Sequence, residues 1–471
     1  MQTEQRTRSE RDSMGEMQVP AEALWGASTQ RAVLNFPVSK LRFNRRFIKA
    51  LGQIKLAAAE VNRDLGLLDP KQAEPIIAAA REVVDGNWDD HFVIDIFQTG
   101  SGTSTNMNAN EVIANLAIER LGGERGARGL VHPNDHVNIG QSSNDVIPAA
   151  IQLAVLAGIQ EDLIPACEEL RDVFMEKSRE FWPIIKTGRT HLQDATPIRL
   201  GQEFLGYAGQ MDHGVRRLRY AQQELGDLPL GGTAVGTGVN CHPDFARLVS
   251  EKLTQMNGVK VWETDNHFQA QNTLDALVAA SGMIRTVAVS LFKICNDIRW
   301  MASGPRAGIF ELLLPEVQPG SSIMPGKINP VIPESLVQVA AQVLGNDTTV
   351  VLGGISGNFE LNVMMPVSAH NITEAVDLMA SGIRNFTEQC VRGIQATENG
   401  PAMVEKGLAI CTALAPVIGY DAAAKIAKQA FATGRTIREI ARETTDLSDA
   451  DLERILNPED MTKPGLEGSG G

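Results

Sequence analysis

The chain has 471 residues, of which 43% are hydrophobic and 21% charged, a composition ordinary for a soluble globular protein of two or three domains. Its formal net charge of −14, from 43 basic and 57 acidic residues, disfavours a broad nucleic-acid-binding face, which needs clustered positive charge. The segment Met1–Ser13 lacks the apolar core of a secretory signal, and no apolar stretch approaches the roughly 18 residues of a membrane span. We therefore expect a cytoplasmic protein with no membrane and no nucleic-acid partner.

The five cysteines form no CxxC pair and show no metal-ligand spacing. An odd number of cysteines in a cytoplasmic protein indicates reduced thiols. We expect no structural zinc.

Residues 1–140 are expected to form an N-terminal domain of mixed helices and loops. Apolar residues at helical spacing then predict long helices over Ile151–Phe181, Arg199–Leu225, Asn266–Ser303 and from Pro333 onward. The third carries a stretch that is small and apolar on nearly every face, Leu277–Val289, so this helix should be buried. Helices of about 35 residues exceed the usual mean length, and they predict a central bundle over residues 141–396, of a kind that can pack against other subunits.

Shorter helical patterns follow Thr397 and predict a small C-terminal domain over residues 397–471. These helices are expected over Pro401–Leu414, Tyr420–Thr433 and Thr436–Glu443. Strand signals are few and short. The predicted fold class is mainly α, with three domains.

Two polar, glycine-punctuated segments in the first third of the chain precede apolar helical patterns: Gln98–Glu111 and His132–Asp145. Hydroxyl and amide groups at a helix N-terminus can bind an anion. The simpler interpretation of each is a capped turn, with Asn144 or Asp145 as the N-cap in the second. The residues alone leave both interpretations open.

Two further segments place reactive side chains between helices. Thr187–Pro197 contains His191, one of only eight histidines, among polar neighbours. Gln318–Glu334 compresses a serine pair, a lysine, an amide and a carboxylate into a short loop with glycine and proline at both ends. Asn329 followed by Pro330 is typical of an N-cap and a first helical residue, which would put Glu334 near the first turn. A plain turn into a helix remains the alternative.

The glycine-rich segment Leu230–Asn240 superficially resembles a phosphate-binding loop, but it lacks the GxGxxG and GxxxxGK[ST] patterns and a surrounding βαβ unit. We interpret its glycines as permitting a tight turn or close backbone approach. This segment is the feature on which an assignment as a nucleotide-dependent oxidoreductase would depend. That assignment predicts that NAD stabilises the protein, which we do not expect.

Taken together, these segments resemble the fumarase/aspartase superfamily. Gly320–Asn329, read as GSSIMPGKIN, is similar to the signature of that superfamily, and the resemblance runs from Arg8–Gly15 and Leu24–Gln30 to Asn457–Pro464. The resemblance implies a central five-helix bundle, a homotetramer with a twenty-helix core, and active sites that each combine segments of three subunits. It also implies a lyase that interconverts malate and fumarate, with no cofactor and no metal.

Within the superfamily, His191 favours class II fumarases, because aspartases typically carry glutamine there. Gly326 points the same way, since aspartases typically have alanine at this position. In contrast, Val331–Glu334 resembles the aspartase sequence more closely. Aspartate ammonia-lyase therefore stays the alternative activity, and a helical oligomer with an inactive site is the non-enzymatic one.

The resemblance also assigns roles by residue. It implies Ser321 as the base that removes a proton from C3 of malate, His191 as the group that handles water, and Glu334 as the partner of His191. Lys327 and Asn329 would stabilise the intermediate. The full set implied for substrate binding is Ser101, Gly102, Thr103, Ser142, Ser143, Asn144, Thr190, Ser322, Lys327, Ile328 and Asn329.

A second, non-catalytic anion site is implied for the segment His132, Pro133, Asn134 and Asp135. Fumarases with that site often have a basic residue three positions before the histidine. This chain has Gly129 there, with Arg128 adjacent, so it departs from the pattern of the family at this point.

Overall fold

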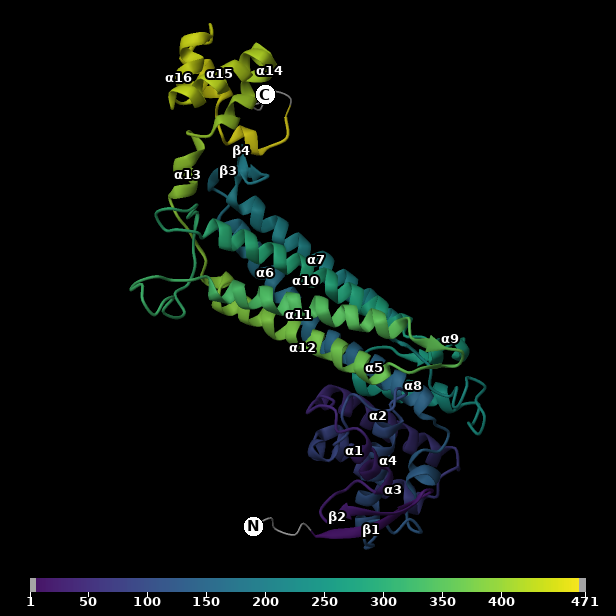
Figure 1. Ribbon diagram of the computed structural model, residues 1–471. Helices are drawn as coiled ribbons and strands as arrows, with labels where there is room; N and C mark the ends of the chain where they lie inside the picture. The colour runs from purple at the N-terminus through teal and green to yellow at the C-terminus, as the bar shows by residue number, and fades with distance from the viewer. Residues whose placement is uncertain (1–5, 466–471) are drawn as a thin grey trace. The chain divides into compact units, whose positions relative to one another are not determined.

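The computed structural model describes residues 6–465 (Figure 1). Contacts divide the chain into two compact units. Unit 1 consists of Met1–Pro165, Val215–Ala288 and Ala341–Ala380, and unit 2 of Ala166–Gly214, Val289–Ala340 and Ser381–Gly471. The division into three domains at residues 140 and 396 stays a prediction, and the ends of the first and last of these domains, 1–5 and 466–471, lie outside the described residues.

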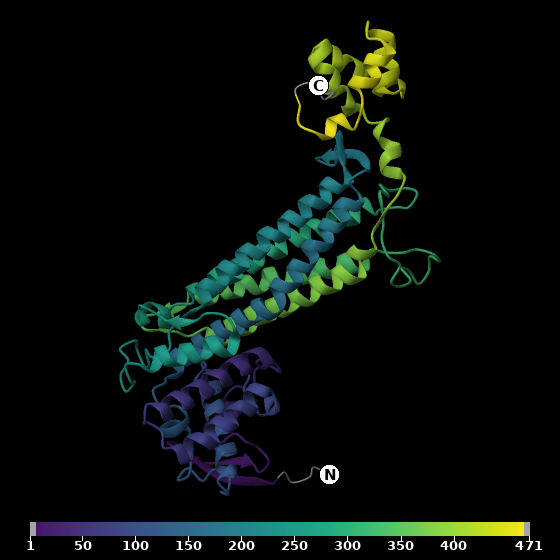
Figure 2. The same ribbon diagram turned by 180° about the vertical axis from the view of Figure 1, so that it is seen from behind.

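Unit 1 begins with an antiparallel hairpin followed by packed helices, which lie together in both views (Figures 1 and 2). Their bounds are β1 (Thr7–Asp12), β2 (Gly15–Pro20), α1 (Ala27–Asn35), α2 (Arg45–Asp64), α3 (Pro70–Asp85), η1 (Asp89–His91) and α4 (Thr103–Arg120). Helix α2 is buried along most of its length because it packs on α3 and on helices from later in the unit. Asn44 starts α2 by accepting a hydrogen bond from the backbone N–H of Phe47.

One continuous helix spans Ser143–Glu180. It consists of α5 (Ser143–Gly158), the π-helical turn η3 (Ile159–Leu163) and α6 (Ile164–Glu180). The helix predicted over Ile151–Phe181 is confirmed, and it starts earlier because Ser142 forms a capping box with Asp145. The cap predicted at Asn144 or Asp145 was therefore misplaced, although Asp145 takes part in it.

Four further long helices are α7 (Leu200–Leu225), α10 (Asp275–Met301), α11 (Val331–Gly354) and α12 (Met365–Gln389). The predictions of Arg199–Leu225 and of a helix near Pro333 are confirmed. The single helix predicted over Asn266–Ser303 was wrong, because Thr273 has an extended backbone that separates α9 (His267–Asn272) from α10. The remaining elements of unit 1 are η2 (Pro133–Val137), β5 (Asp227–Leu228), α8 (Phe245–Asn257), β6 (Trp262–Glu263), β8 (Gly357–Asn358) and β9 (Leu361–Asn362).

By length and composition alone, two helices could cross a membrane, Ser143–Glu180 and Asp275–Met301. The most apolar window of the first is 83% buried, which is the burial of a core helix, whereas that of the second is only 44% buried. The prediction that Leu277–Val289 is buried thus holds for one face. The chain packs on that face and leaves the other exposed, with Val289 52% exposed.

Unit 2 contains short elements in addition to its share of the long helices. These are β3 (Ile185–Thr190), β4 (Gln193–Arg199), β7 (Leu312–Leu313), η4 (Val391–Gly393), β10 (Gln395–Ala396), α13 (Asn399–Val404), η5 (Leu408–Leu414), α14 (Ala415–Ile418), α15 (Tyr420–Thr433), α16 (Ile437–Thr444), α17 (Asp449–Ile455) and η6 (Asp460–Thr462). The last helices enclose a hydrophobic core of their own, which includes Leu414, Ile437 and Leu456.

Two of the three short helices predicted near the C-terminus are confirmed. Tyr420–Thr433 has the predicted bounds, and Thr436 caps α16 through a capping box with Glu439. The helix predicted over Pro401–Leu414 is interrupted instead, since α13 ends at Val404 and a 3-10 helix begins at Leu408. Between them lies Gly407, whose extended backbone conformation ends the helical path.

Candidate active site

The N-terminus of α4 presents two hydroxyl groups of the Ser101–Thr103 segment in unit 1. The Oγ of Ser101 and the Oγ1 of Thr103 lie 2.8 Å apart and share a hydrogen bond. Between them, Gly102 has φ +71°, and a Cβ there would come within 2.8 Å of Ile147 on α5. Only glycine allows this approach. The helix N-terminus and the hydroxyls together can accept an anion.

The N-terminus of α5 lies beside that of α4 and carries Ser142, Ser143 and Asn144. Ser143 is 9% exposed, and its Oγ accepts a hydrogen bond of 3.0 Å from Nδ2 of Asn106 on α4. Asn144 donates from Nδ2 to the backbone carbonyl of Ala234, at 2.8 Å. The structure therefore brings the two sequence-predicted anion-binding segments of unit 1 together.

The glycine-rich segment Leu230–Asn240 closes over the start of α5. The carboxylate of Asp145 accepts hydrogen bonds from the backbone N–H groups of Ser142, Gly231 and Thr233. Gly231 and Gly236 have positive φ, so the glycines permit a tight turn and close approach, as predicted. Burial raises the pKa of Asp145 to about 6, against the effect of these three hydrogen bonds and of Lys55.

Lys55 on α2 is a residue of this region that the sequence analysis missed. Its side chain is fully buried, and its ammonium group donates to Oδ1 of Asn138 at 2.9 Å and to Oε1 of Gln141 at 3.0 Å. Burial lowers the pKa of Lys55 to about 7, and the negative charge of Asp145 acts in the opposite direction. The signal in the sequence that could have identified Lys55 is its position within the otherwise apolar stretch Ile54–Ala59.

The segment predicted as a second anion site, His132–Asp135, lies at the start of η2, and His132 is the N-cap of this element. Nδ1 of His132 lies 3.2 Å from the backbone nitrogens of Asn134 and Asp135, and also 3.2 Å from Oδ2 of Asp135. The ring can accept from the amides when neutral or donate to the carboxylate when protonated. A Cβ at Gly129 would meet no atom within 4 Å, and Arg128 lines a small cavity together with Pro133, Glu10 and Glu111.

In unit 2, the hairpin of β3 and β4 carries Thr190 and His191 at its exposed tip. Thr190 pairs with Gln193, so His191 and Leu192 form a two-residue turn. Both have positive φ, 57° and 59°, the pattern of a type I′ turn usually made with Asn and Gly. Non-glycine residues in this conformation are strained, and such strain is concentrated at functional sites.

A buried cluster of four charges holds that hairpin. Glu311 receives two hydrogen bonds from the guanidinium of Arg189 and lies 3.0 Å from Nζ of Lys186, which also pairs with Glu203 at 2.8 Å. Glu311 and Lys186 are both 2% exposed. Burial raises the pKa of Glu203, against the effect of Lys186.

The loop Gly320–Asn329 forms a compact turn before α11. The backbone N–H of Gly320 donates to the carbonyl of Lys327 at 2.8 Å, and a Cβ at Gly320 would meet that same oxygen at 2.3 Å. Ser321 Oγ accepts hydrogen bonds from the backbone N–H groups of Ile323 and Met324, at 3.2 and 3.0 Å. The positions implied for substrate contact are exposed or partly exposed: Ser322, Lys327, Ile328 and Asn329.

Glu334 lies in the first turn of α11, as predicted, with Arg299 at 3.9 Å. In the described part of the chain, His191 and Glu334 form no ion pair or hydrogen bond with each other. The implied site residues fall into two groups. Unit 1 holds those at the starts of α4 and α5 and the segment of His132, and unit 2 holds the hairpin tip, the Ser321 loop and Glu334.

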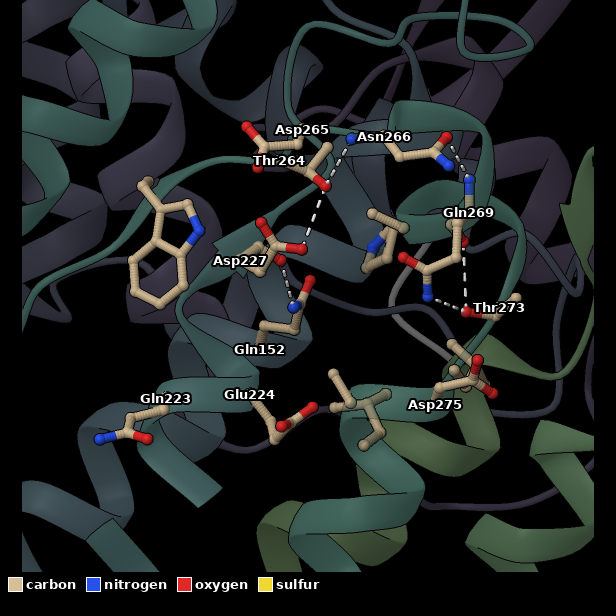
Figure 3. A pocket seen from close by; sticks show the side chains of 16 residues that line it. Gln152, Gln223, Glu224, Asp227, Thr264, Asp265, Asn266, Gln269, Thr273 and Asp275 are labelled. Atoms are coloured by element: carbon tan, nitrogen blue, oxygen red, sulfur yellow. Dashed lines mark hydrogen bonds between the residues drawn. The ribbon is translucent and has the colours of Figure 1, made fainter. Parts of the chain in front are cut away.

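A cavity with a volume of about 590 Å³ lies elsewhere in unit 1 (Figure 3). It is lined by carboxylates and amides, among them Glu224, Asp227, Asp265 and Asp275, and by none of the implied site residues. A cavity with this lining repels a dicarboxylate. The hydroxyl and amide groups at the starts of α4 and α5, and the hydroxyl, amide and ammonium groups of the Ser321 loop, are therefore the better candidates for binding an anionic substrate.

Comparison with known proteins identifies the family of the chain. The family model described as Lyase matches residues 15–345, and the model described as Fumarase C C-terminus matches residues 410–463. Fumarate hydratase class II 2 of Bradyrhizobium diazoefficiens is 51% identical and aligns over 98% of this chain and 97% of its own. The chain belongs to the class II fumarate hydratase family. Fumarate hydratase class II of Halobacterium salinarum is 53% identical, with 98% of each chain covered.

Solved structures extend the similarity to the whole fold of a class II fumarate hydratase. The class II fumarase from Schistosoma mansoni superposes with a TM-score of 0.95 at 38% identity, covering 97% of this chain and 99% of that one. The native fumarate lyase:delta crystallin from Brucella melitensis gives 0.89 at 44% identity, over 96% and 100%. The predicted fold class, mainly α with a long helical bundle, is confirmed.

Proposed function

We propose that the chain catalyses the reversible interconversion of (S)-malate with fumarate and water, a step of the tricarboxylic acid cycle, as a cytoplasmic enzyme that needs no metal or nicotinamide. Membership of the class II fumarate hydratase family supports this activity. The geometry that carries the proposal is the contact of Ser321 Oγ with the backbone N–H groups of Ile323 and Met324.

In the proposed dehydration, Ser321 acts as an alkoxide and takes the C3 proton of malate. Two N–H donors aimed at Oγ stabilise the alkoxide relative to the hydroxyl and so favour its formation. The electron pair of the C–H bond moves into the neighbouring carboxylate and gives an aci-carboxylate. Loss of the C2 hydroxyl with one proton then yields fumarate and water.

The intermediate needs positive charge beside the carboxylate that gains electron density. We assign this role to Lys327 and Asn329, which follow Ser321 in the same compact loop. One preorganised donor of this kind lowers the barrier by roughly 3 kcal/mol. Movement of the exposed loop over the substrate would exclude bulk water and strengthen these interactions.

The starts of α4 and α5 are proposed to hold the substrate carboxylates through Ser101, Thr103, Ser142, Ser143 and Asn144. They offer hydroxyls and amides at two adjacent helix N-termini. Such N-termini favour negative charge because their backbone N–H groups and dipoles point at the ligand. Thr190 and Ser322 would contribute from unit 2.

His191 is proposed to deliver and accept the proton of water, with Glu334 fixing its tautomer. In the described chain these residues do not touch, so the pair would form between subunits. A homotetramer in which three subunits contribute to each site meets this requirement. It would also cover the face of α10 that one chain leaves exposed.

The segment of His132 is proposed as a second anion site without a catalytic role. His132 begins η2 and has backbone N–H groups beside its ring. Arg128 is the basic group available in place of Gly129, although Glu10 and Glu111 line the same small cavity. Binding of a dicarboxylate there would leave the turnover chemistry unchanged.

The activity is tested by incubating the purified protein with malate and, separately, with aspartate. Formation of fumarate is followed by the ultraviolet absorbance of its double bond, and ammonia is measured in parallel. We expect turnover of malate and none of aspartate. Ammonia release from aspartate without conversion of malate would replace the proposal with aspartate ammonia-lyase, the activity that the sequence of Val331–Glu334 favours.

Ser321→Ala removes the proposed base and should lower kcat by at least about 100-fold, the usual contribution of a general base. The melting temperature should stay within a few degrees of the parent, because Ser321 lies in a partly exposed loop. A matched control is Ser356→Ala, which removes a hydroxyl that bonds only to the carbonyl of Leu352. Parent-like turnover in Ser321→Ala would exclude the serine as the base.

A further inference from the structure

Lys55 is a buried cation with only neutral hydrogen-bond partners. Its side chain has no exposed surface, and the oxygens that it contacts belong to the amides of Asn138 and Gln141. No carboxylate among residues 6–465 forms an ion pair with it. Asp145 acts on it through space, but the carboxylate of Asp145 is occupied by three backbone N–H groups.

A chain of amides leads from this lysine to Ser143. Oδ1 of Asn138, which accepts from Lys55, also lies 3.4 Å from Nδ2 of Asn106. The same Nδ2 donates to Ser143 Oγ at 3.0 Å. Because Oγ accepts from this amide, the hydroxyl hydrogen of Ser143 is free to donate in another direction.

The cluster also contains polar atoms that the protein does not satisfy. Asn106 is 1% exposed and Asn110 fully buried, and the Oδ1 of each has no hydrogen-bond donor among the described residues. A buried lysine without a counter-ion and buried amide oxygens without donors both cost stability. Such costly arrangements are found at functional sites, where the electrostatic field of the buried groups acts on a bound ligand.

We propose that Lys55 is a positioning residue of the dicarboxylate site, which fixes Ser143 as a hydrogen-bond donor through Asn138 and Asn106 and, when protonated, places positive charge behind the bound carboxylate. The inference rests on the proposed function, because it takes Ser143 as a substrate contact. It adds a residue that has no contact with the substrate and lies in a helix outside the segments implied by family resemblance.

The test compares the parent with Lys55→Met, which keeps the length and volume of the side chain but removes its charge and its donors. Succinate, a dicarboxylate that cannot react, is titrated by calorimetry, and KM and kcat are measured with malate. We expect the Kd of succinate and the KM of malate to rise about tenfold, the effect of losing one hydrogen bond to a charged group. The change in kcat should stay within about twofold, since the interaction is uniform in ground and transition states.

If Lys55 has a purely structural role, its replacement should alter kcat and the melting temperature rather than Kd and KM. Misfolding of part of the protein would lower kcat and the melting temperature and leave Kd and KM at the parental values. That result would overturn the inference. Lys177→Met is the matched control, because Lys177 is also buried but pairs with Glu180 and the carbonyl of Ile394 in unit 2. It should bind succinate like the parent.

Asn138→Asp provides a second variant that keeps the shape of the cluster. It gives Lys55 a carboxylate at hydrogen-bond distance, so the positive charge is neutralised locally while the lysine keeps a partner. We expect weaker succinate binding here too, and unchanged binding in both variants would overturn the inference. If the parent binds succinate without converting malate, the proposed function fails and the comparison of Kd values still decides the role of Lys55.

Discussion

Lys55 and Asp145 place two ionisable groups of opposite sign in the interior of unit 1, and burial moves both pKa values toward neutrality. The pKa of Lys55 falls from 10.5 to about 7, so between these values the unfolded chain binds a proton that the folded chain lacks. The contribution of Lys55 to stability therefore rises with pH across this window. For Asp145 the folded pKa is raised, and its contribution is lost as the pH rises through about 6.

The pH dependence of Lys55 predicts how its replacement alters stability. The melting temperature of Lys55→Met, relative to the parent, should become less favourable as pH rises from about 7 toward 10. The parent gains stability in this range as its buried lysine loses its proton, and the variant cannot. Differential scanning calorimetry at several pH values measures the difference, and a gap that is constant with pH would contradict the lowered pKa.

Among the structural elements, the hairpin of β3 and β4 depends on buried charges more than on apolar packing. Its tip contains two residues with positive φ, and its strand β3 is fixed through Lys186 and Arg189 to Glu311. Because the hydrogen bonds from Arg189 are bidentate, they define the orientation of the strand as well as its distance. Glu311 thus determines where His191 is presented.

Glu311→Gln should destabilise the protein by about 3–5 kcal/mol, since it removes the buried negative charge that pairs with the buried Lys186 and the partly exposed Arg189. The melting temperature measures this loss. Glu316→Gln, a substitution of an exposed glutamate in the same connecting segment, should change stability by less than about 0.5 kcal/mol. Equal melting temperatures for the two variants would mean that the cluster contributes nothing net.

The elements also show where sequence reasoning succeeded and where it failed. Helical spacing located α7 and α15 closely, because their apolar positions repeat without interruption. The break at Thr273 was missed, since no glycine or proline marks it and the extended conformation of one residue is set by tertiary packing. The local spacing around Ser321 predicted a turn before α11. In contrast, Lys55 was missed because its importance depends on contacts with Asn138 and Gln141, which are far away in the sequence.

At the scale of the whole molecule, exposed apolar side chains on and next to α10 and α11 support the proposed assembly. Val289 of α10, Leu352 of α11 and Ile355, which directly follows α11, are 52%, 52% and 75% exposed. Side chains of this type on long helices are usually covered by other helices. The proposed tetramer would bury them, and it would also supply the residues from other subunits that each site needs.

Val289→Lys is expected to weaken this assembly by placing a charge on the exposed face of α10. Light scattering should show a smaller particle, and activity should fall together with size because a separated subunit has an incomplete site. Val417→Lys alters a valine of similar exposure, 54%, on α14 and should preserve both properties. A dissociated variant that keeps full activity would refute a site shared between subunits.

The π-helical turn Ile159–Leu163 gives the long helix Ser143–Glu180 two registers. A π turn holds about one residue more than an α turn, so every side chain after it faces roughly 100° away from where an unbroken α-helix would place it. Such a turn is what remains when a single-residue insertion is absorbed inside a helix without breaking it. During evolution, such an insertion could rotate the apolar face of α6 about the helix axis. The capped start of α5, with Ser142 and Ser143, would keep its orientation.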